Sequence, residues 1–231
     1  MTKVLAVGDL HGRLGMLENL ILQNPGADFV LQAGDFGAYN DNGACCGMPP
    51  RRRHWSEFSA YANGKRRFSK PVFFVKGNHE HFRLLDDAEA GAPRSEPVKI
   101  AENLFYIPNG RIFNIQGIVV AGLGGNYSEA CHKRPRGGLR RRHFSEGEIT
   151  TILRYRGKVD ILLTHDIGEG MIPSFRGLSQ ELLDLGIRLR PTWWIHGHFH
   201  CYHEADLGFT KVMGLDAIHG QETSSRMIEF P

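Results

Sequence analysis

The sequence contains few cysteines, and none of them lies in a metal-binding or redox pattern. Only four occur in 231 residues, and no two have the spacing of a CxxC motif. Cys45 and Cys46 are adjacent, and neighbouring residues rarely form a disulfide because their Cα atoms lie closer together than a disulfide usually requires. We therefore expect reduced thiols, as in an intracellular protein, at the four positions Cys45, Cys46, Cys131 and Cys201.

Long apolar runs are also missing. No segment approaches the roughly 20 apolar residues that a membrane-spanning helix needs, and the apolar run at residues 4–7 is too short for a signal peptide. We expect a cytoplasmic protein without a membrane partner, and no feature points to an obligate protein partner. With 231 residues, 41% hydrophobic and 23% charged, one globular domain over residues 1–231 is expected.

The charge is small overall but clustered. The net charge is only +3, yet basic residues gather at 51–54, at 132–136 and at 140–143. The last two clusters lie in a Gly- and Arg-rich segment without helix or strand periodicity, residues 124–143, which we call the basic loop. Such clusters favour phosphate-rich partners, although a solvated basic surface is an equally plain reading. Long loops in compact domains are usually functional or disordered.

Strand and helix patterns alternate along much of the chain. The expected strands are residues 3–7, 29–33, 71–76, 161–164 and 193–196, and the expected helices are residues 14–23, 55–63, 146–155 and 180–185, with Ser145 as an N-cap. Between residues 104 and 123 short β runs are separated by Asn109-Gly110 and Gln116-Gly117, which are typical of hairpin turns. This alternation, followed by meander-like strands, predicts an α/β protein.

Five segments place a metal-binding type of side chain directly after a β-type run. In open α/β sheets, sites form beyond the carboxyl ends of the strands, so five such ends can converge on one point. Each short motif is common by itself, but five in order indicate a metal site. The segments are Gly8-Asp9-Leu10-His11-Gly12, Gly34-Asp35, Gly77-Asn78-His79-Glu80, Thr164-His165-Asp166 and Gly197-His198-Phe199-His200.

The spacing within these segments fits shared ligation. Side chains two residues apart in an extended segment face the same way, so Asp9 and His11 can reach one metal together. By the same rule Asn78 and His79 point to opposite sides, and one can bind metal while the other transfers a proton. Mixed nitrogen and oxygen donors suit Mn, Fe or Zn better than Mg or Ca. Ligation without cysteine and rich in carboxylates argues against a purely structural zinc site.

In this order, the blocks DxH, GD, GNHE, H and GHxH resemble the calcineurin-like metallophosphoesterases. The resemblance implies two packed mixed β-sheets flanked by helices, an αββα sandwich. It implies two divalent metal ions, with Asp35 bridging them. It also implies hydrolysis of a phosphate ester by a hydroxide that bridges the two ions, without a covalent intermediate, and an uncoordinated catalytic His79. The implied ligands of the first ion are Asp9, His11, Asp35 and His200, and those of the second are Asp35, Asn78, His165 and His198.

Phosphoprotein phosphatases of this class carry Asp-Arg-Gly shortly after the second block. Here Phe36-Gly37-Ala38 follows Asp35, so the arginine that grips phosphate and the acid that orients the catalytic histidine are both missing there. This difference argues against a protein phosphatase. Glu80 adjoins His79 but is expected to point the other way, which leaves the orienting partner of His79 unassigned.

A closer resemblance is to the catalytic core of the RNA lariat debranching enzymes. It extends through residues 34–36, 49–51, 74–80, 101–106, 124–127 and 159–166. In that family the loop beyond Tyr127 helps to hold branched RNA, and the resemblance implies substrate-binding roles for Asn126, Tyr127, Arg140 and Arg141. Those enzymes often have Cys at the position of Asp9 and carry a further C-terminal domain, so the resemblance covers the core alone.

These observations leave two activities open. The first is a phosphodiesterase acting on RNA or a nucleotide, in the manner of 2′–5′ debranching. The second is a phosphomonoesterase acting on a nucleotide or a small metabolite. A non-catalytic scaffold is disfavoured because the ligand set and His79 are intact. We expect Phe144 and Tyr155 to pack in the core rather than to stack on bases, and His196 to be a buried structural histidine.

Overall fold

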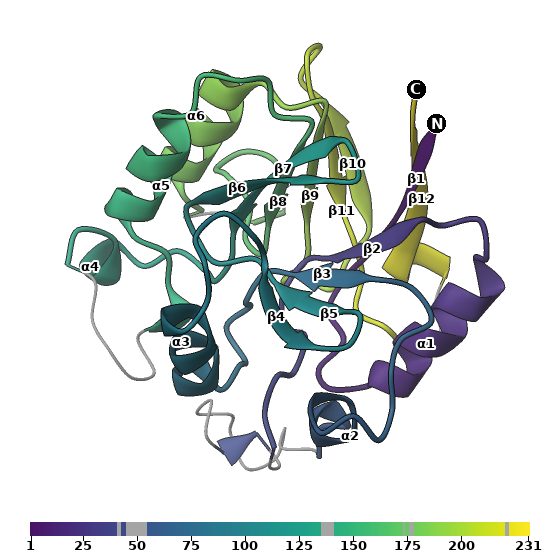
Figure 1. Ribbon diagram of the computed structural model, residues 1–231. Coiled ribbons are helices and arrows are strands. Elements are labelled where there is room, and N and C mark those ends of the chain that lie inside the picture. Colours follow the sequence, from purple (N-terminus) through teal and green to yellow (C-terminus); the bar gives the residue numbers. More distant parts are fainter. Residues whose placement is uncertain (41–42, 45–54, 135–140, 173, 176–177, 220–221) are drawn as a thin grey trace.

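The computed structural model describes residues 1–40, 43–44, 55–134, 141–172, 174–175, 178–219 and 222–231 (Figure 1). Within these ranges, twelve strands form two six-stranded sheets that pack against each other. The two chain ends lie side by side because the first strand pairs antiparallel with the last, from Thr2 opposite Phe230 to Val7 opposite Ser225. The αββα sandwich expected from the sequence is confirmed.

Both sheets have a parallel centre and antiparallel edges. In the first sheet four central strands are parallel, and the strand order is β12 (Ser225–Phe230), β1 (Thr2–Val7), β2 (Phe29–Gln32), β3 (Val72–Phe74), β5 (Leu104–Tyr106) and β4 (Val98–Ala101). The second sheet repeats this plan in the order β10 (His203–Asp206), β11 (Lys211–Gly214), β9 (Trp193–His196), β8 (Ile161–Thr164), β7 (Ile118–Leu123) and β6 (Arg111–Ile115).

Helices cover the outer face of each sheet. The first sheet packs against α1 (Leu14–Gln23), α2 (Phe58–Ala62) and α3 (Phe82–Ala90). The second packs against α5 (Glu146–Leu153) and α6 (Gln180–Leu189), while the short α4 (Glu129–His132) lies in the basic loop. A 3₁₀ turn, Glu222–Ser224, precedes β12. None of the helices in the described ranges is long and apolar enough to span a membrane.

The alternation of side chains along β1 shows why the sandwich forms. Val4 and Ala6 point to the core between the sheets, whereas Leu5 and Val7 point to the core beneath the helices. All four are buried. Strands of a central parallel sheet are buried on both faces, which is why this run reads as continuously apolar. The ends of such strands are therefore the places where polar groups can gather.

Most expected elements are present, with several differences. The 55–63 helix is shorter, Phe58–Ala62, and α3 and β4 were not expected. Gln116-Gly117 does form a hairpin turn, joining β6 to β7. Asn109-Gly110 does not, because β5 before it pairs in the first sheet and β6 after it pairs in the second. A local turn signal cannot specify which sheet the next strand joins.

Candidate metal centre

The predicted metal ligands gather beyond the carboxyl ends of five strands. Asp9 and His11 follow β1, Asp35 follows β2 and Asn78 follows β3, all in the first sheet. The second sheet adds His165 directly after β8, and both His198 and His200 after β9. Parallel strands end at the same edge of a sheet, so the two packed sheets bring their polar loops to one place.

The backbone at four of these residues is in the left-handed region. The φ angles are 49° at His11, 50° at Asp35, 72° at His198 and 48° at His200. Each such conformation costs a non-glycine residue about 1 kcal/mol or more, and it persists only where the surrounding structure holds it. Strained backbone clustered at one site is typical of functional groups held in a fixed arrangement.

Asp9, His11 and His200 form one group of donors. Nε2 of His200 lies 3.0 Å from Oδ2 of Asp9 and 3.0 Å from Nε2 of His11. Nε2 of His11 lies 3.7 Å from the same Asp9 oxygen. One carboxylate oxygen and two imidazole nitrogens thus face one another closely enough to hold one cation.

Asp35, Asn78 and His165 form a second group. Nε2 of His165 lies 3.1 Å from Oδ1 of Asn78 and 3.6 Å from Oδ1 of Asp35. Nδ1 of His165 lies 2.8 Å from the carbonyl oxygen of Ala33 and donates to it, which leaves Nε2 as the lone-pair atom facing the group. The ring of His198 lies 4.8 Å from the ring of His165, centroid to centroid.

Asp35 lies between the two groups, as expected of a bridging ligand. Its Oδ1 is the oxygen near His165, and its Oδ2 lies 3.7 Å from Nδ1 of His11. Asp9 also approaches both groups, since its Oδ1 lies 4.0 Å from Nδ1 of His165 and accepts the backbone N–H of His198. The structure brings all seven predicted ligands together.

The two donor groups contain two buried carboxylates, Asp9 and Asp35. Burial disfavours the charge on Asp9, but His165, His200 and His11 outweigh it, so the pKa of Asp9 lies below its ordinary value. Burial likewise opposes the charge on Asp35, and His165 and His11 hold its pKa below the usual range. Uncompensated buried charges are costly, so ionised carboxylates facing imidazole lone pairs fit divalent cations. The donor set therefore fits two metal ions.

His79 stands beside these groups without joining either. Its ring lies 6.0 Å from the ring of His11, and its backbone N–H donates to Oδ1 of Asp35 at 2.7 Å. Burial lowers the pKa of His79, although Asp35 acts in the opposite direction. Nδ1 is buried and has no hydrogen-bond partner among the described residues.

Glu80 is turned away from His79, as expected, and it has a role that the sequence did not indicate. Its carboxylate accepts four backbone N–H groups, those of Phe36, Gly37, Ala38 and Gly77, at 2.6 to 3.3 Å. The pKa of Glu80 is raised to about 8 by burial and by Asp35, while these hydrogen bonds act against the shift. Glu80 thereby fastens the loop carrying Asp35 to the loop carrying Asn78.

The predicted substrate-binding residues differ in their contacts. Asn126 is half-buried, and its Oδ1 has no partner in the described part of the chain. Tyr127 donates its N–H to Asp166 and its hydroxyl to Glu181, the latter at 3.2 Å. Arg141 forms an ion pair with Asp86 of α3 and does not reach the metal ligands. Arg140 lies outside the described residues.

The two aromatic residues expected in the core also differ. Phe144 is buried and packs in the core beneath α5 and α6, which confirms the expectation. Tyr155 is 41% exposed, so its expected core position is wrong. It follows the last turn of α5, where the chain has already left the packed face of the helix.

Comparison with known proteins agrees with this geometry. The chain is 27% identical over 218 residues to the lariat debranching enzyme of Schizosaccharomyces pombe, covering 80% of this chain and 46% of that protein. It is 24% identical over 253 residues to the lariat debranching enzyme of Saccharomyces cerevisiae, covering 91% and 60%. The chain thus spans about half the length of these curated relatives.

A solved structure shows the same fold. The protein TT1561 of Thermus thermophilus superposes with a TM-score of 0.61 at 18% identity, covering 94% of this chain and 89% of that one. The model of the family described as calcineurin-like phosphoesterase matches residues 2–202, which include every residue of the two donor groups. With this match over most of its length, the chain belongs to the calcineurin-like phosphoesterase family, whose members have a dinuclear metal centre.

Proposed function

We propose that this protein is a metal-dependent phosphodiesterase that acts on RNA or a nucleotide, with a 2′–5′ branched phosphodiester as the first substrate to test. The observation that carries the proposal is the meeting of seven donor side chains from five strand ends around the buried Asp35. The similarity to two lariat debranching enzymes supports the choice of substrate class.

Each of the two donor groups is proposed to hold one metal ion. Asp9, His11, Asp35 and His200 would hold one ion, and Asp35, Asn78, His165 and His198 would hold the other. Mixed imidazole and oxygen donors favour Mn, Fe or Zn. When bound, two such ions lower the pKa of a coordinated water and neutralise the oxygens of a phosphoryl group.

The side chains of the protein contribute position and proton control. The pKa values of Asp9 and Asp35 lie below their ordinary range, so both side chains are ionised at neutral pH and can serve as metal ligands. His79 lies outside both donor groups and burial lowers its pKa, so its neutral ring would donate a hydrogen bond to the departing oxygen. Glu80 keeps the Asp35 and Asn78 loops in contact and thereby fixes the approach of the phosphate ester.

A substrate panel tests this proposal. Protein loaded with Mn²⁺, Fe²⁺ or Zn²⁺ is assayed on a 2′–5′ branched RNA, a linear RNA, a cyclic nucleotide, bis(p-nitrophenyl) phosphate and p-nitrophenyl phosphate. We expect cleavage of the diesters, with the branched RNA preferred. Preference for the monoester would instead support a phosphomonoesterase. Metal-loaded protein that cleaves no phosphate ester would contradict the proposal.

A variant at His79 separates its role from metal binding. His79→Ala removes the side chain that lies outside both donor groups, so we expect turnover to fall by about 10²-fold while the metal content stays unchanged. Asp35→Asn is the matched comparison, because it should lower the metal content as well as turnover. Metal analysis of both proteins, beside the rate measurement, distinguishes the two effects.

The organisation and setting of the protein are part of the same proposal. We take residues 1–231 to act as one metallophosphoesterase domain, carrying the basic loop at 124–143. We place it in the cytoplasm without an obligate protein partner, in line with the free thiols of Cys131 and Cys201. Fractionation of cells that produce the protein, followed by size-exclusion chromatography of the extract, tests this placement.

A further inference from the structure

We propose that a cleft beside the first donor group binds a nucleotide next to the hydrolysed phosphate, with its base stacked on Trp55 and its own phosphate held by Arg13. The cleft lies between residues 12–19, where the chain enters α1, and residues 55–67, which include α2, and we call it the Trp55 cleft. This inference rests on the proposed phosphoesterase function. It adds a binding site for RNA on a surface to which the described part of the basic loop does not contribute.

Hydrogen bonds fix the segment before α2 to two of the loops that carry the proposed metal ligands. The N–H of Glu57 donates to the carbonyl of Gly12, in the loop after β1, at 2.9 Å. The hydroxyl of Ser56 donates to the carbonyl of Gly37, in the loop after β2, at 2.6 Å. A Cβ at Gly12 would lie 2.7 Å from the Cβ of Ser56, so the segments are in close contact. Trp55 directly precedes Ser56, and its backbone is therefore held close to the metal centre.

Trp55 is a large aromatic side chain that the core does not use. It is 75% exposed, more than any other Phe, Tyr or Trp in the described ranges, whereas Trp194 is completely buried. A stacked nucleobase would cover the exposed face of the indole ring, and every base offers such a face. Single exposed apolar residues are common on protein surfaces, so the case for a ligand depends on what surrounds Trp55.

The charged side chains around Trp55 are mainly basic. Those that line the cleft are Arg13, Glu18, Glu57, Arg66 and Arg67. The carboxylate of Glu57 accepts the N–H of Gly15 at 2.5 Å. The carboxylate of Glu18 accepts the N–H of Ser69 at 3.1 Å. Both acidic groups are thus engaged by the protein itself, and the arginines outnumber them. A cleft with this balance of charge favours a ligand that carries phosphate.

Arg13 connects the cleft to the metal centre. It lies two residues after His11, and one of its terminal nitrogens donates to Nδ1 of His219 at 2.7 Å. The ring of His219 lies 6.4 Å from the ring of His200, centroid to centroid. No carboxylate of the described residues forms an ion pair with Arg13, unlike Arg66, which lies 3.7 Å from Glu57. A guanidinium has five N–H donors, so Arg13 retains both charge and donors for phosphate oxygens.

A nucleotide fits this cleft better than a protein partner does. The cleft has a volume of about 750 Å³, within the range of sites for small ligands. The centre of a protein–protein interface is depleted of charged residues, whereas five line this cleft. An aromatic ring beside arginines is the usual combination in proteins that bind single-stranded nucleic acid. Three strands leave the branch point of a branched RNA, so a surface apart from the basic loop can hold one of them.

The test uses protein loaded with Mn²⁺ and two kinds of measurement. Fluorescence anisotropy follows the binding of a labelled single-stranded RNA pentamer with phosphorothioate linkages, which resist cleavage. Rates are measured on a branched RNA and on methyl p-nitrophenyl phosphate, a diester without a base. For Trp55→Ala we expect about 10-fold weaker RNA binding and a similar loss of kcat/KM on the branched RNA. The loss on the base-free diester should be less than about 2-fold. Trp55→Phe keeps an aromatic ring and should recover most of the binding.

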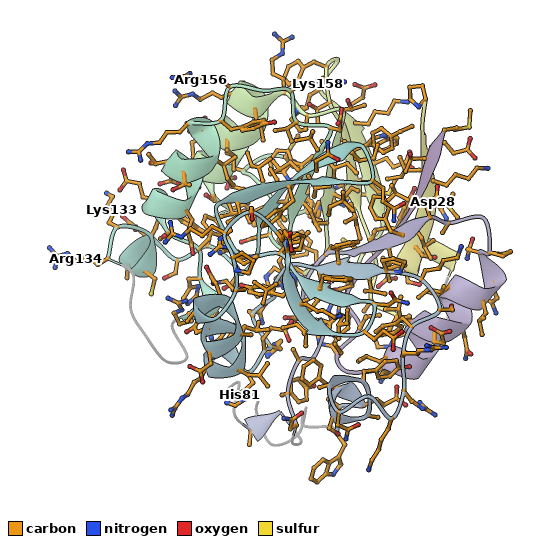
Figure 2. All side chains as sticks on the ribbon, in the orientation of Figure 1. Asp28, His81, Lys133, Arg134, Arg156 and Lys158 are labelled. Atoms are coloured by element: carbon orange, nitrogen blue, oxygen red, sulfur yellow. The ribbon has the colours of Figure 1, made fainter. Side chains whose placement is uncertain are left out.

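Arg13 has a separate readout in the salt dependence of binding. Each phosphate contact to a single strand adds about 0.7 to the slope of log affinity against log salt concentration. Arg13→Ala should reduce the slope by about this amount, whereas Trp55→Ala should leave the slope unchanged because stacking releases no counterions. Arg156→Ala is the control for charge, because Arg156 is exposed and projects outward from the side of the molecule opposite to α2 (Figure 2). It should change neither affinity nor slope.

Phe209→Ala is the control for an exposed aromatic residue. Phe209 is 37% exposed in the loop between β10 and β11, so its removal should leave RNA binding unchanged. If Trp55→Ala behaves like Phe209→Ala, the inference is wrong. Equal losses on the branched RNA and the base-free diester would also contradict it, because Trp55 would then only support the metal-binding loops. Thermal unfolding of each variant checks that all are folded.

The same measurements separate this inference from the proposed function. If the unaltered protein cleaves no ester, the proposed function fails. RNA affinity and its salt dependence then decide by themselves whether the Trp55 cleft binds a nucleotide, since neither measurement requires turnover. Cleavage of branched RNA that is equally fast in the unaltered protein, Trp55→Ala and Arg13→Ala would instead support the function and exclude the cleft as a binding site.

Discussion

At the scale of single residues, histidines of one short segment serve different purposes. His198 and His200 lie at the metal centre, whereas His196, two residues before His198, is completely buried at the end of β9. Nδ1 of His196 donates to the carbonyl oxygen of Gly197 at 3.0 Å, and its Nε2 lies 3.2 Å from Nε2 of His203. His196 is therefore buried, as expected.

The burial of His196 predicts a specific loss of stability in acid. Burial, and then repulsion by His203, lower the pKa of His196 to about 3 in the folded protein. The unfolded chain binds this proton near pH 6.5, so the contribution is complete above that pH and is lost as pH falls towards 3. Between pH 6 and 4.5, His196→Asn should reduce the slope of unfolding free energy against pH by about 1.4 kcal/mol per unit.

Urea unfolding of both proteins in the presence of a chelator gives this comparison. The chelator is needed because metal binding depends on pH and would otherwise add to the slope. Parallel curves for the two proteins over this range would show that His196 does not contribute the titrating proton.

Glu80 gives a second prediction at this scale. Glu80→Gln replaces an acceptor of four N–H groups by an amide that presents its own hydrogens to two of them. We expect the unfolding free energy to fall by about 2–3 kcal/mol, since backbone donors lose their partners. The exposed Glu102→Gln, which loses only a surface pair with Arg67, should change it by less than about 1 kcal/mol. Chemical denaturation of the two variants checks this difference.

At the scale of elements, the helix boundaries show how much local sequence decides. The spacing of apolar residues predicted α1 with both ends correct, and Ser145 correctly marked the start of α5. Its side chain and that of Glu148 form a capping box, each satisfying a backbone N–H of the other residue. By contrast, α3 was not expected, although it begins soon after the GNHE block and buries Phe82 and Leu85.

The capping box predicts a measurable effect on α5. Ser145→Ala removes the side-chain acceptor of the Glu148 N–H, so the unfolding free energy should fall by about 1 kcal/mol. Ser128 precedes α4 in the same position, but its side chain makes no capping hydrogen bond. Ser128→Ala is therefore the matched control, and thermal or chemical unfolding should show a change of only a few tenths of a kcal/mol. Equal losses in the two variants would contradict the assignment.

At the scale of the whole molecule, the metal centre joins the two sheets. Asp9, Asp35 and Asn78 belong to loops of the first sheet, while His165 and the His198/His200 pair belong to loops of the second. Glycines permit this approach. A Cβ at Gly34 would lie 2.5 Å from Nδ1 of His165, and a Cβ at Gly77 would lie 2.0 Å from the backbone nitrogen of Asp35.

Metal removal should therefore weaken the whole fold. Ions that bind the native protein and not the unfolded chain add about 2.7 kcal/mol of stability at 100 times their dissociation constant. We expect EDTA to lower the melting temperature by several degrees and added Mn²⁺ or Zn²⁺ to restore it. In His198→Ala the melting temperature should respond less to EDTA, because one proposed ligand is missing. A chelator-insensitive melting temperature in the unaltered protein would contradict the metal centre.

The sequence by itself predicted the proposed ligands and most strands, because metal ligation demands particular side chains and buried parallel strands demand continuous apolar runs. The five blocks that contain Asp9, Asp35, Asn78, His165 and His198 could be identified from residue type and order. Only the tertiary structure decided which strands share a sheet, where Glu80 points and that Arg141 pairs with Asp86. Those outcomes depend on contacts between segments that lie far apart in the chain, and local sequence does not encode such contacts.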